Sequence, residues 1–76
     1  MGKKISEIKA APQGGHTAWG IKTAVWFSKN GRRYYAGPFW SGRDALRFCR
    51  FLRKRDRLPT ADDFSGVVSA FVIQEI

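Results

Sequence analysis

The chain has 76 residues, with 14 Lys and Arg against 6 Asp and Glu, which gives a formal net charge of +8 at pH 7. Hydrophobic residues make up 43% of it and aromatic residues 14%, which excludes a disordered basic tail and predicts one folded domain over residues 1–76. One Cys and one His exclude an intramolecular disulfide, a Cys-based zinc cage and a His-rich metal site. No apolar run is long enough to span a membrane. We therefore expect a cytoplasmic protein that uses no membrane, metal or cofactor.

Residues 1–20 are the least regular part of the sequence. Ile5 and Ile8 are three residues apart, a spacing that fits neither an alternating strand nor a stable helix. Residues 12–16, Pro-Gln-Gly-Gly-His, are typical of a loop because Gly and Pro interrupt regular structure. We expect residues 1–16 to be a flexible arm or a short edge strand.

A β-hairpin is predicted around Asn30-Gly31, the commonest pair in a two-residue hairpin turn. Residues 21–28 are rich in strand-forming side chains, and residues 32–40 return as the second strand until Pro38 weakens its pairing. Because a two-residue turn sets the register, the facing residues follow by counting outward from the turn. The predicted pairs are Lys29–Arg32, Ser28–Arg33, Phe27–Tyr34, Trp26–Tyr35 and Val25–Ala36.

The alternation of side chains along this hairpin divides it into two faces. The face expected to meet the core carries Ile21, Thr23, Val25, Phe27, Tyr34 and Ala36. The opposite face is mixed, with an aromatic cross-strand pair flanked by positive charge, and carries Lys22, Ala24, Trp26, Arg33, Tyr35 and Phe39.

One amphipathic helix is predicted after the hairpin. Ser41 and Asp44 have the spacing of a capping box, and the helix should run to about Arg55 or Arg57, before Pro59. Residues 60–63 favour a further short turn, and residues 67–76 are apolar on both faces, which favours a central or well-covered strand. The predicted fold is α+β: an antiparallel sheet of three to four strands packed on one helix, in the order β-β-α-β with a flexible or short-strand N-terminal arm.

The first candidate binding surface is a line of cations on that helix. Arg43, Arg47, Arg50, Lys54 and Arg57 are spaced four, three, four and three residues apart, so they fall on one side. A face that serves only solubility usually mixes both signs, and like charges at this spacing repel each other. We favour anion binding over plain solvation for this face.

The second candidate surface is the mixed face of the hairpin with its basic tip. Trp26 and Tyr35, between Lys22 and Arg33, are typical of a platform on which bases stack, and Lys29 and Arg32 add charge at the turn. The alternative is that these rings are buried under the arm, under the last strand or in a dimer interface. Because the cationic side of the helix faces away from the sheet, one duplex cannot easily contact both surfaces.

Catalytic groups are poorly placed in this sequence. His16 has no carboxylate or nucleophile close in sequence, and Cys49 falls on the apolar side of the predicted helix. Asp62 and Asp63 are explained by capping of the following turn. We expect a protein that is not an enzyme.

Residues 23–53 carry a Trp-bearing strand, an Asn-Gly turn followed by basic residues, a Gly-x-Phe motif, a Ser cap and an Ala-bearing helix. This order resembles the amino-terminal arm-binding domains of phage and transposon tyrosine integrases. The resemblance implies a three-stranded antiparallel sheet backed by a helix, with Lys22, Trp26, Arg33 and Tyr35 turned toward the DNA major groove. The sequence departs from the family pattern in two places. The family's first strand should precede Trp19, where this sequence has only a weak strand pattern. The family domain ends at its helix, so residues 67–76 have no counterpart in it.

The leading functional hypothesis is a small non-enzymatic nucleic-acid-binding protein of a phage or mobile element, with DNA favoured over RNA. It would contact phosphates through the basic helix face or the basic hairpin. The alternative is a phage-encoded protein–protein inhibitor, similar in role to anti-CRISPR proteins, that acts on a nucleic-acid-handling or defence complex of the host. A homodimer formed through the edge of the last strand is compatible with either hypothesis.

Overall fold

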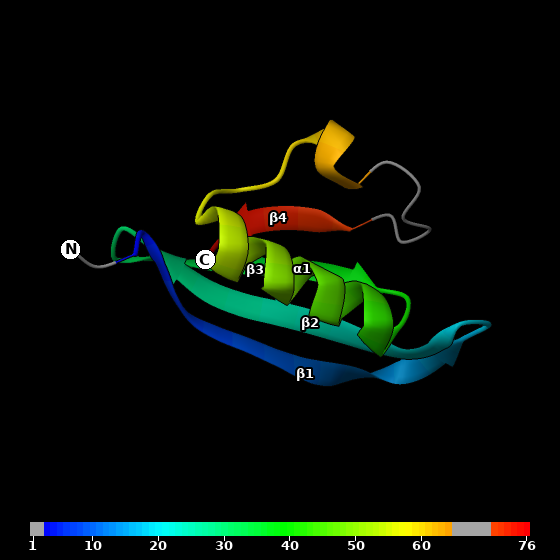
Figure 1. The fold of residues 1–76 in the computed structure, drawn as a ribbon. Coiled ribbons are helices and arrows are strands. Elements are labelled where there is room, and N and C mark those ends of the chain that lie inside the picture. The colour runs from blue at the N-terminus through cyan, green and yellow to red at the C-terminus, as the bar shows by residue number, and fades with distance from the viewer. Residues whose placement is uncertain (1–2, 65–70) are drawn as a thin grey trace.

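The structure, a computed structural model, describes residues 3–64 and 71–76. The elements follow the order β1 (Ile5–Thr17), β2 (Gly20–Lys29), β3 (Arg32–Phe39), α1 (Gly42–Arg55), the 3₁₀ helix η1 (Ala61–Phe64) and β4 (Val72–Glu75). The strands form one antiparallel sheet in sequence order, with α1 packed across it (Figure 1). The α+β architecture is confirmed. The predicted order, β-β-α-β with a flexible or short-strand N-terminal arm, is not matched exactly, because the arm is a full strand, so that three strands precede the helix and one follows it.

The predicted N-terminal arm is a 13-residue strand, and a β-bulge explains why its sequence pattern is irregular. Ser6 pairs with Ser28 and Lys9 pairs with Trp26, so β1 has one residue more than β2 between these pairs. The extra residue is accommodated at Glu7, whose backbone adopts a left-handed conformation with φ of 53°. The bulge turns Ile5 and Ile8 toward the same core although they are three residues apart.

The β2–β3 hairpin has the register expected from its turn. All five predicted pairs, from Lys29–Arg32 to Val25–Ala36, face each other. Asn30 and Gly31 have φ of 52° and 81°, which is the left-handed conformation that a two-residue turn of this kind requires.

Beyond Ala36 a second bulge reverses the faces of β3. Val25 pairs with Ala36 and Thr23 pairs with Phe39, so the Gly37-Pro38 segment contributes one extra residue. The prediction for Phe39 is therefore wrong: its ring lies fully buried in the core rather than on the opposite face. The prediction for Ile21 is also wrong, since this side chain, near the start of β2, is 47% exposed.

The helix begins and ends where its local sequence predicts. Ser41 is the N-cap, and its hydroxyl accepts the Asp44 backbone N–H at 3.3 Å. The last helical residue is Arg55, and Asp56 follows as a left-handed C-cap with φ of 56°. The short turn predicted at residues 60–63 is also confirmed, as η1.

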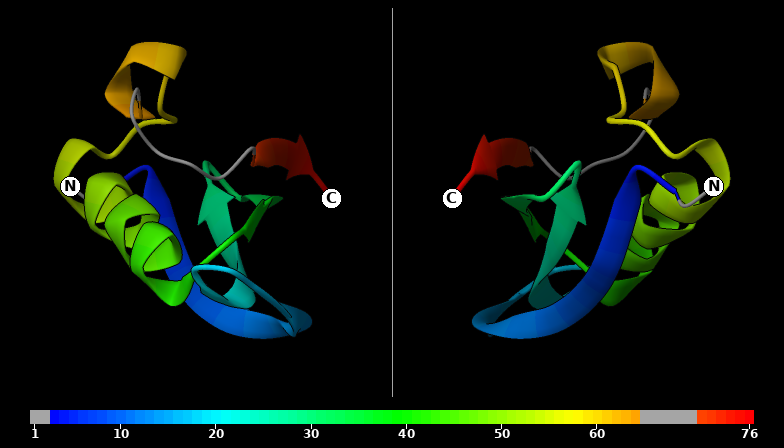
Figure 2. Two further views of the ribbon diagram at one scale, coloured as in Figure 1. Left: turned by 90° about the vertical axis from the view of Figure 1, so that its right-hand side faces the viewer. Right: turned by 90° about the vertical axis from the view of Figure 1, so that its left-hand side faces the viewer.

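The C-terminal strand lies at the edge of the sheet, so the expected central or well-covered position is wrong. Strand β4 pairs with β3 alone, and Val72 remains largely exposed. The strand is described from Val72 onward, and residues 67–70 of the prediction lie outside the described residues. Figure 2 shows α1 on one side of the curved sheet, with β1 and β4 extending the sheet at its two edges.

A cluster of phenylalanine rings joins the helix to the sheet. The buried ring of Phe48 on α1 lies 6.0 Å from Phe27 on β2 and 5.2 Å from Phe39 on β3, measured between ring centroids. It also lies 5.8 Å from Phe64 on η1 and 5.5 Å from Phe71, which precedes β4. Such pairs stabilise a fold beyond the burial of their area. One helical ring therefore connects four other parts of the chain.

Asp56 holds the start of β1 against the end of α1. Its carboxylate accepts the backbone N–H groups of Lys4 and Ile5 at 2.9 and 2.8 Å. These two hydrogen bonds, with smaller contributions from the charges of Lys3 and Lys4, lower the pKa of the Asp56 carboxyl because they stabilise its ionised form. The cap of the helix thus also anchors the first strand.

We expect Leu52→Ala to lower the free energy of unfolding by about 2–5 kcal/mol, because Leu52 is fully buried between α1 and the sheet. The matched control is Leu46→Ala in the same helix, where the side chain is 47% exposed and the cost should stay below about 1 kcal/mol. Urea unfolding followed by circular dichroism measures both variants. Equal losses for the two variants would contradict the packing described here.

We expect Asp56→Asn to be less stable than the wild type at pH 7, because it loses the charge that accepts the two N–H groups while Asn still tolerates the left-handed cap. Since the pKa of Asp56 is lower in the folded state, its stabilisation is present above the unfolded pKa and is lost as the pH falls through the folded one. The difference between variant and wild type should therefore shrink below about pH 4. Urea unfolding at several pH values measures it, and a difference independent of pH would contradict this role.

Candidate functional site

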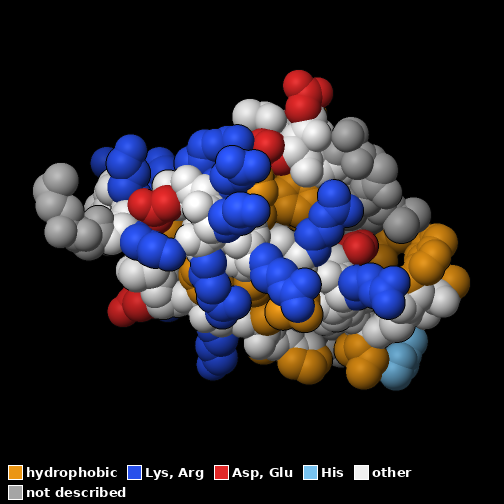
Figure 3. All heavy atoms as spheres, viewed as in Figure 1, with side chains coloured by type: hydrophobic (Ala, Val, Ile, Leu, Met, Phe, Trp, Pro, Cys, Tyr) orange, Lys and Arg blue, Asp and Glu red, His pale blue; other side chains and the backbone are white. Residues whose placement is uncertain are grey.

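The outer face of α1 carries a continuous line of cations. The helix turns its apolar residues Ala45, Phe48, Cys49 and Leu52 into the core. This orientation leaves Arg43, Arg47, Arg50 and Lys54, here called the basic stripe, exposed on the opposite side. Figure 3 views the molecule from the side of α1 and shows Lys and Arg side chains spread across that face.

The charge of α1 is strongly unbalanced. Its 14 residues include six Lys and Arg and one acid, Asp44, so the helix alone contributes 6 − 1 = +5. Arg53, Lys54 and Arg55 lie in the last turn, where positive charge is stabilised by the helix dipole. From Arg43 to Lys54 the stripe extends for about 16 Å at the rise of an α-helix, the length of about five base steps of a nucleic-acid duplex.

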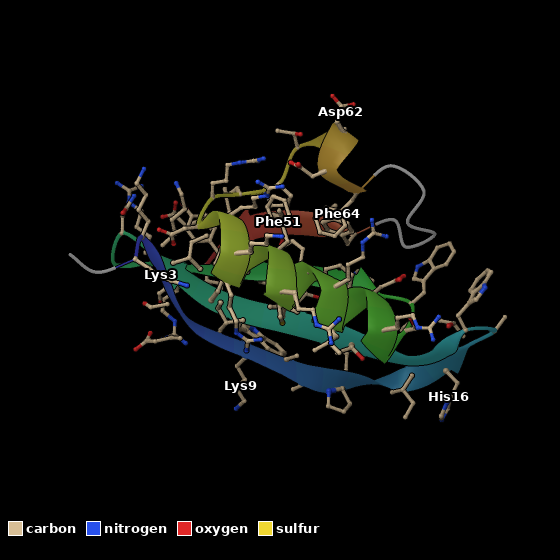
Figure 4. All side chains as sticks on the ribbon, viewed as in Figure 1. Lys3, Lys9, His16, Phe51, Asp62 and Phe64 are labelled. Atoms are coloured by element: carbon tan, nitrogen blue, oxygen red, sulfur yellow. The ribbon has the colours of Figure 1, made fainter. Side chains whose placement is uncertain are left out.

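Two phenylalanine rings lie beside the C-terminal half of the stripe. The rings of Phe51 and Phe64 are 5.4 Å apart, and Figure 4 shows these two side chains next to each other. The Arg47 guanidinium lies 5.6 Å from the centre of the Phe64 ring, within the range of a cation–π interaction. Together with Arg50 and Lys54, these residues border a shallow surface hollow. The Phe64 ring therefore restricts the position of the Arg47 charge at the surface.

Arg57 is separated from the basic stripe by its contacts. It lies two residues beyond the end of α1, and both of its terminal nitrogens bind the Asp63 carboxylate, at 3.0 and 3.2 Å. The same carboxylate accepts the backbone N–H of Thr60 at 2.7 Å, and these partners hold the pKa of Asp63 well below its usual range. Arg57 therefore joins the end of the helix to η1, and its charge is largely offset.

The second candidate surface is on the opposite side of the sheet. By strand register, Lys22, Trp26, Arg33 and Tyr35 share this face, and Lys9 of β1 lies opposite Trp26. The Trp26 and Tyr35 rings pack edge to face, with centroids 5.7 Å apart and planes at 67°. Because β1 and β4 extend the sheet at its edges, neither strand covers this pair among the described residues.

A carboxylate offsets part of the charge on that face. Glu7 accepts the Ser28 hydroxyl at 2.8 Å and Arg33 Nη1 at 3.2 Å. It borders, with Lys9, Trp26 and Arg33, a shallow hollow on the sheet. With Lys9, Lys22 and Arg33 counted against Glu7, the net charge of this face is 3 − 1 = +2, well below the net charge of +5 on α1.

The two remaining predicted residues, Lys29 and Arg32, lie at the tip of the β2–β3 hairpin. They face each other beside Asn30 and border a small hollow with Tyr34. Arg32 lies 3.5 Å from Glu75 of β4, an exposed ion pair of little energetic weight. The structure therefore divides the predicted residues among the helix, the sheet face and the hairpin tip, with Arg57 apart from all three, rather than bringing them into one site.

Sequence reasoning missed an exposed tryptophan at the other end of the molecule. Trp19 lies in the turn between β1 and β2, is 56% exposed and stacks on Trp40, with ring centroids 5.3 Å apart. The signal was a Trp-Gly pair directly before a strand, in a segment that was expected to be irregular. Trp19 borders a shallow hollow with Ser41, Arg43 and Asp44, next to the first cation of the stripe.

The one cysteine considered for catalysis lies in the core. Cys49 is buried, and burial raises the pKa of its thiol, which keeps it unreactive at neutral pH. In the described part of the chain no three His, Cys, Asp or Glu side chains are grouped so that they could hold a metal ion. The described helices also include none that is long and apolar enough to cross a membrane.

Comparison with known proteins gives no relative from which a function could be transferred. No protein-family model matches the sequence, and no curated protein or solved structure matches it significantly.

Proposed function

We propose that this protein binds nucleic acid without catalysis, and that the basic stripe of α1 holds the phosphates of the backbone. The observation that carries the proposal is the line of four exposed cations on a helix with a net charge of +5. Phosphate contacts of this kind give affinity with little dependence on sequence. We further propose, as the sequence led us to expect, that the nucleic acid is DNA and that the protein comes from a phage or mobile element.

The balance of charge favours the helix over the sheet. On the sheet face, Arg33 is bound by Glu7, and at the hairpin tip Arg32 is close to Glu75. Beside the stripe, the carboxylate of Asp63 is held by Arg57 and by Thr60, so it is already paired away from the four cations. An approaching phosphate therefore meets the strongest net positive charge at α1.

The resemblance to integrase arm-binding domains supports nucleic-acid binding but favours the other face. The order β1-β2-β3-α1, with three antiparallel strands before a helix, is the arrangement that this resemblance implies. The first strand precedes Trp19 as that arrangement requires, and β4 leaves the sheet face open within the described residues. The free sheet face around Trp26 and Tyr35 is thus the competing DNA surface.

A salt series separates the two surfaces. Fluorescence anisotropy with duplex DNA should give a slope of log K against log salt of about −3.6 if four phosphates are neutralised. Arg50→Gln/Lys54→Gln should reduce the slope to about −1.8, so that raising the salt from about 50 to 200 mM costs roughly tenfold in affinity instead of roughly 100-fold. Both side chains are exposed, so the fold should be retained.

The matched control is Lys9→Gln/Lys22→Gln, which removes the same charge from the exposed sheet face. This control should keep a slope close to that of the wild type. If the control loses slope while the helix variant keeps it, the sheet is the DNA surface and the proposal for the helix is wrong. If the wild type binds neither DNA nor RNA at about 50 mM salt, nucleic-acid binding itself is wrong and the protein-inhibitor alternative is favoured.

A further inference from the structure

Trp19 presents one face of its indole ring to solvent at the end of the basic stripe. The angle between the ring planes of Trp19 and Trp40 is 21°, so the two rings are stacked. Trp19 is nevertheless 56% exposed. A ring covered on one face and still this exposed offers its other face to a ligand. Figure 3 shows a group of hydrophobic side chains at the end of the basic face near His16, where β1 turns into β2.

Hydrogen bonds hold this turn in place. The Thr17 hydroxyl accepts the backbone N–H of Trp19 at 3.2 Å and donates to the carbonyl oxygen of Trp40. The hairpin tip is thereby fastened to the residue that precedes the helix cap. A ring that is already fixed loses little conformational entropy when a ligand stacks on it, so more of the stacking energy contributes to binding.

The polar groups beside Trp19 fit a base better than a phosphate. Ser41, Arg43 and Asp44 border the hollow next to the ring. The negative charge of Asp44 opposes a phosphate directly beside the ring, whereas Arg43 can contact the phosphate of the adjoining nucleotide. The surface formed by one indole and its charged neighbours is also much smaller than a stable protein–protein interface, so it suits a small group such as a base better than a protein partner.

The aromatic pair on the sheet is less suited to the same task. Trp26 and Tyr35 pack edge to face at 67° and are both half-buried, so their faces are partly occupied by each other and by the sheet. Trp19 also lies next to Arg43, the first cation of the stripe, whereas Trp26 faces away from the helix.

We propose that Trp19, supported by Trp40, is a stacking platform for an unpaired base, and that the protein therefore prefers nucleic acids with single-stranded segments. This inference rests on the proposed function of the basic stripe. A backbone lying along α1 reaches Arg43 at one end, and the base beyond that point stacks on Trp19 when it has no pairing partner. Base–aromatic stacking of this kind tolerates any base, so the preference is for structure and not for sequence.

The test compares a blunt DNA duplex of about 16 base pairs with the same duplex carrying a single-stranded overhang on one strand, in anisotropy titrations at one salt concentration. The wild type should bind the overhang duplex about tenfold more tightly than the blunt one. Trp19→Leu should abolish this preference and leave the affinity for the blunt duplex within about twofold, because Leu is apolar but cannot stack as an aromatic ring.

Two control variants distinguish stacking from other effects. Trp19→Tyr restores an aromatic face and should retain most of the preference for the overhang. Ile21→Ala removes an exposed apolar side chain from the same hairpin and should leave the preference unchanged. Urea unfolding of all three variants identifies any loss that comes from the fold.

The outcomes separate this inference from the proposed function. Equal, salt-dependent binding of both duplexes by the wild type overturns the role of Trp19 and leaves the basic stripe in place. Retention of the preference in Trp19→Leu also overturns it, since an apolar contact would then be sufficient. Absence of binding to either duplex overturns the proposed function instead.

Discussion

The ring of Phe48 is the point at which the separate parts of this small protein meet. It contacts Phe27 and Phe39 of the sheet, Phe64 of η1, and Phe71 before β4. A chain of 76 residues buries a limited share of its surface, so a few large rings must supply much of the stabilisation. Once this face of α1 is committed to the core, the orientation of every other residue of the helix follows.

That orientation connects the fold to the proposed function. The apolar positions of α1 turn inward, and the same helical period carries Arg43, Arg47, Arg50 and Lys54 outward. Elsewhere acids moderate the positive charge: Glu7 binds Arg33 on the sheet, and Asp63 binds Arg57 beyond the helix. Most of the net charge of +8 therefore lies on the side of the molecule formed by α1, and Trp19 lies beside Arg43 at the start of that helix.

Local signals predicted the middle of the chain and failed at its ends. The Asn30-Gly31 turn set the register of the hairpin, and the Ser41 cap set the start of the helix, because both depend on residues close in sequence. The first strand was predicted only as a short edge strand, with a flexible arm as the alternative, because the bulge at Glu7 breaks the alternation from which strands are recognised. The bulge at Gly37-Pro38 had the same effect on Phe39, whose face could not be counted correctly across an extra residue.

The sequence by itself determined the amphipathic helix, the central hairpin and the five cations spaced along one side, since each follows from the period of a regular element. The tertiary structure decided which cations remain available, because Arg57 is bound to Asp63 only when η1 packs beside the helix. It also decided that Trp19 stacks on Trp40 beside Arg43, a contact between residues 21 positions apart. Periodicity describes one element at a time, whereas a binding surface is formed where several elements meet.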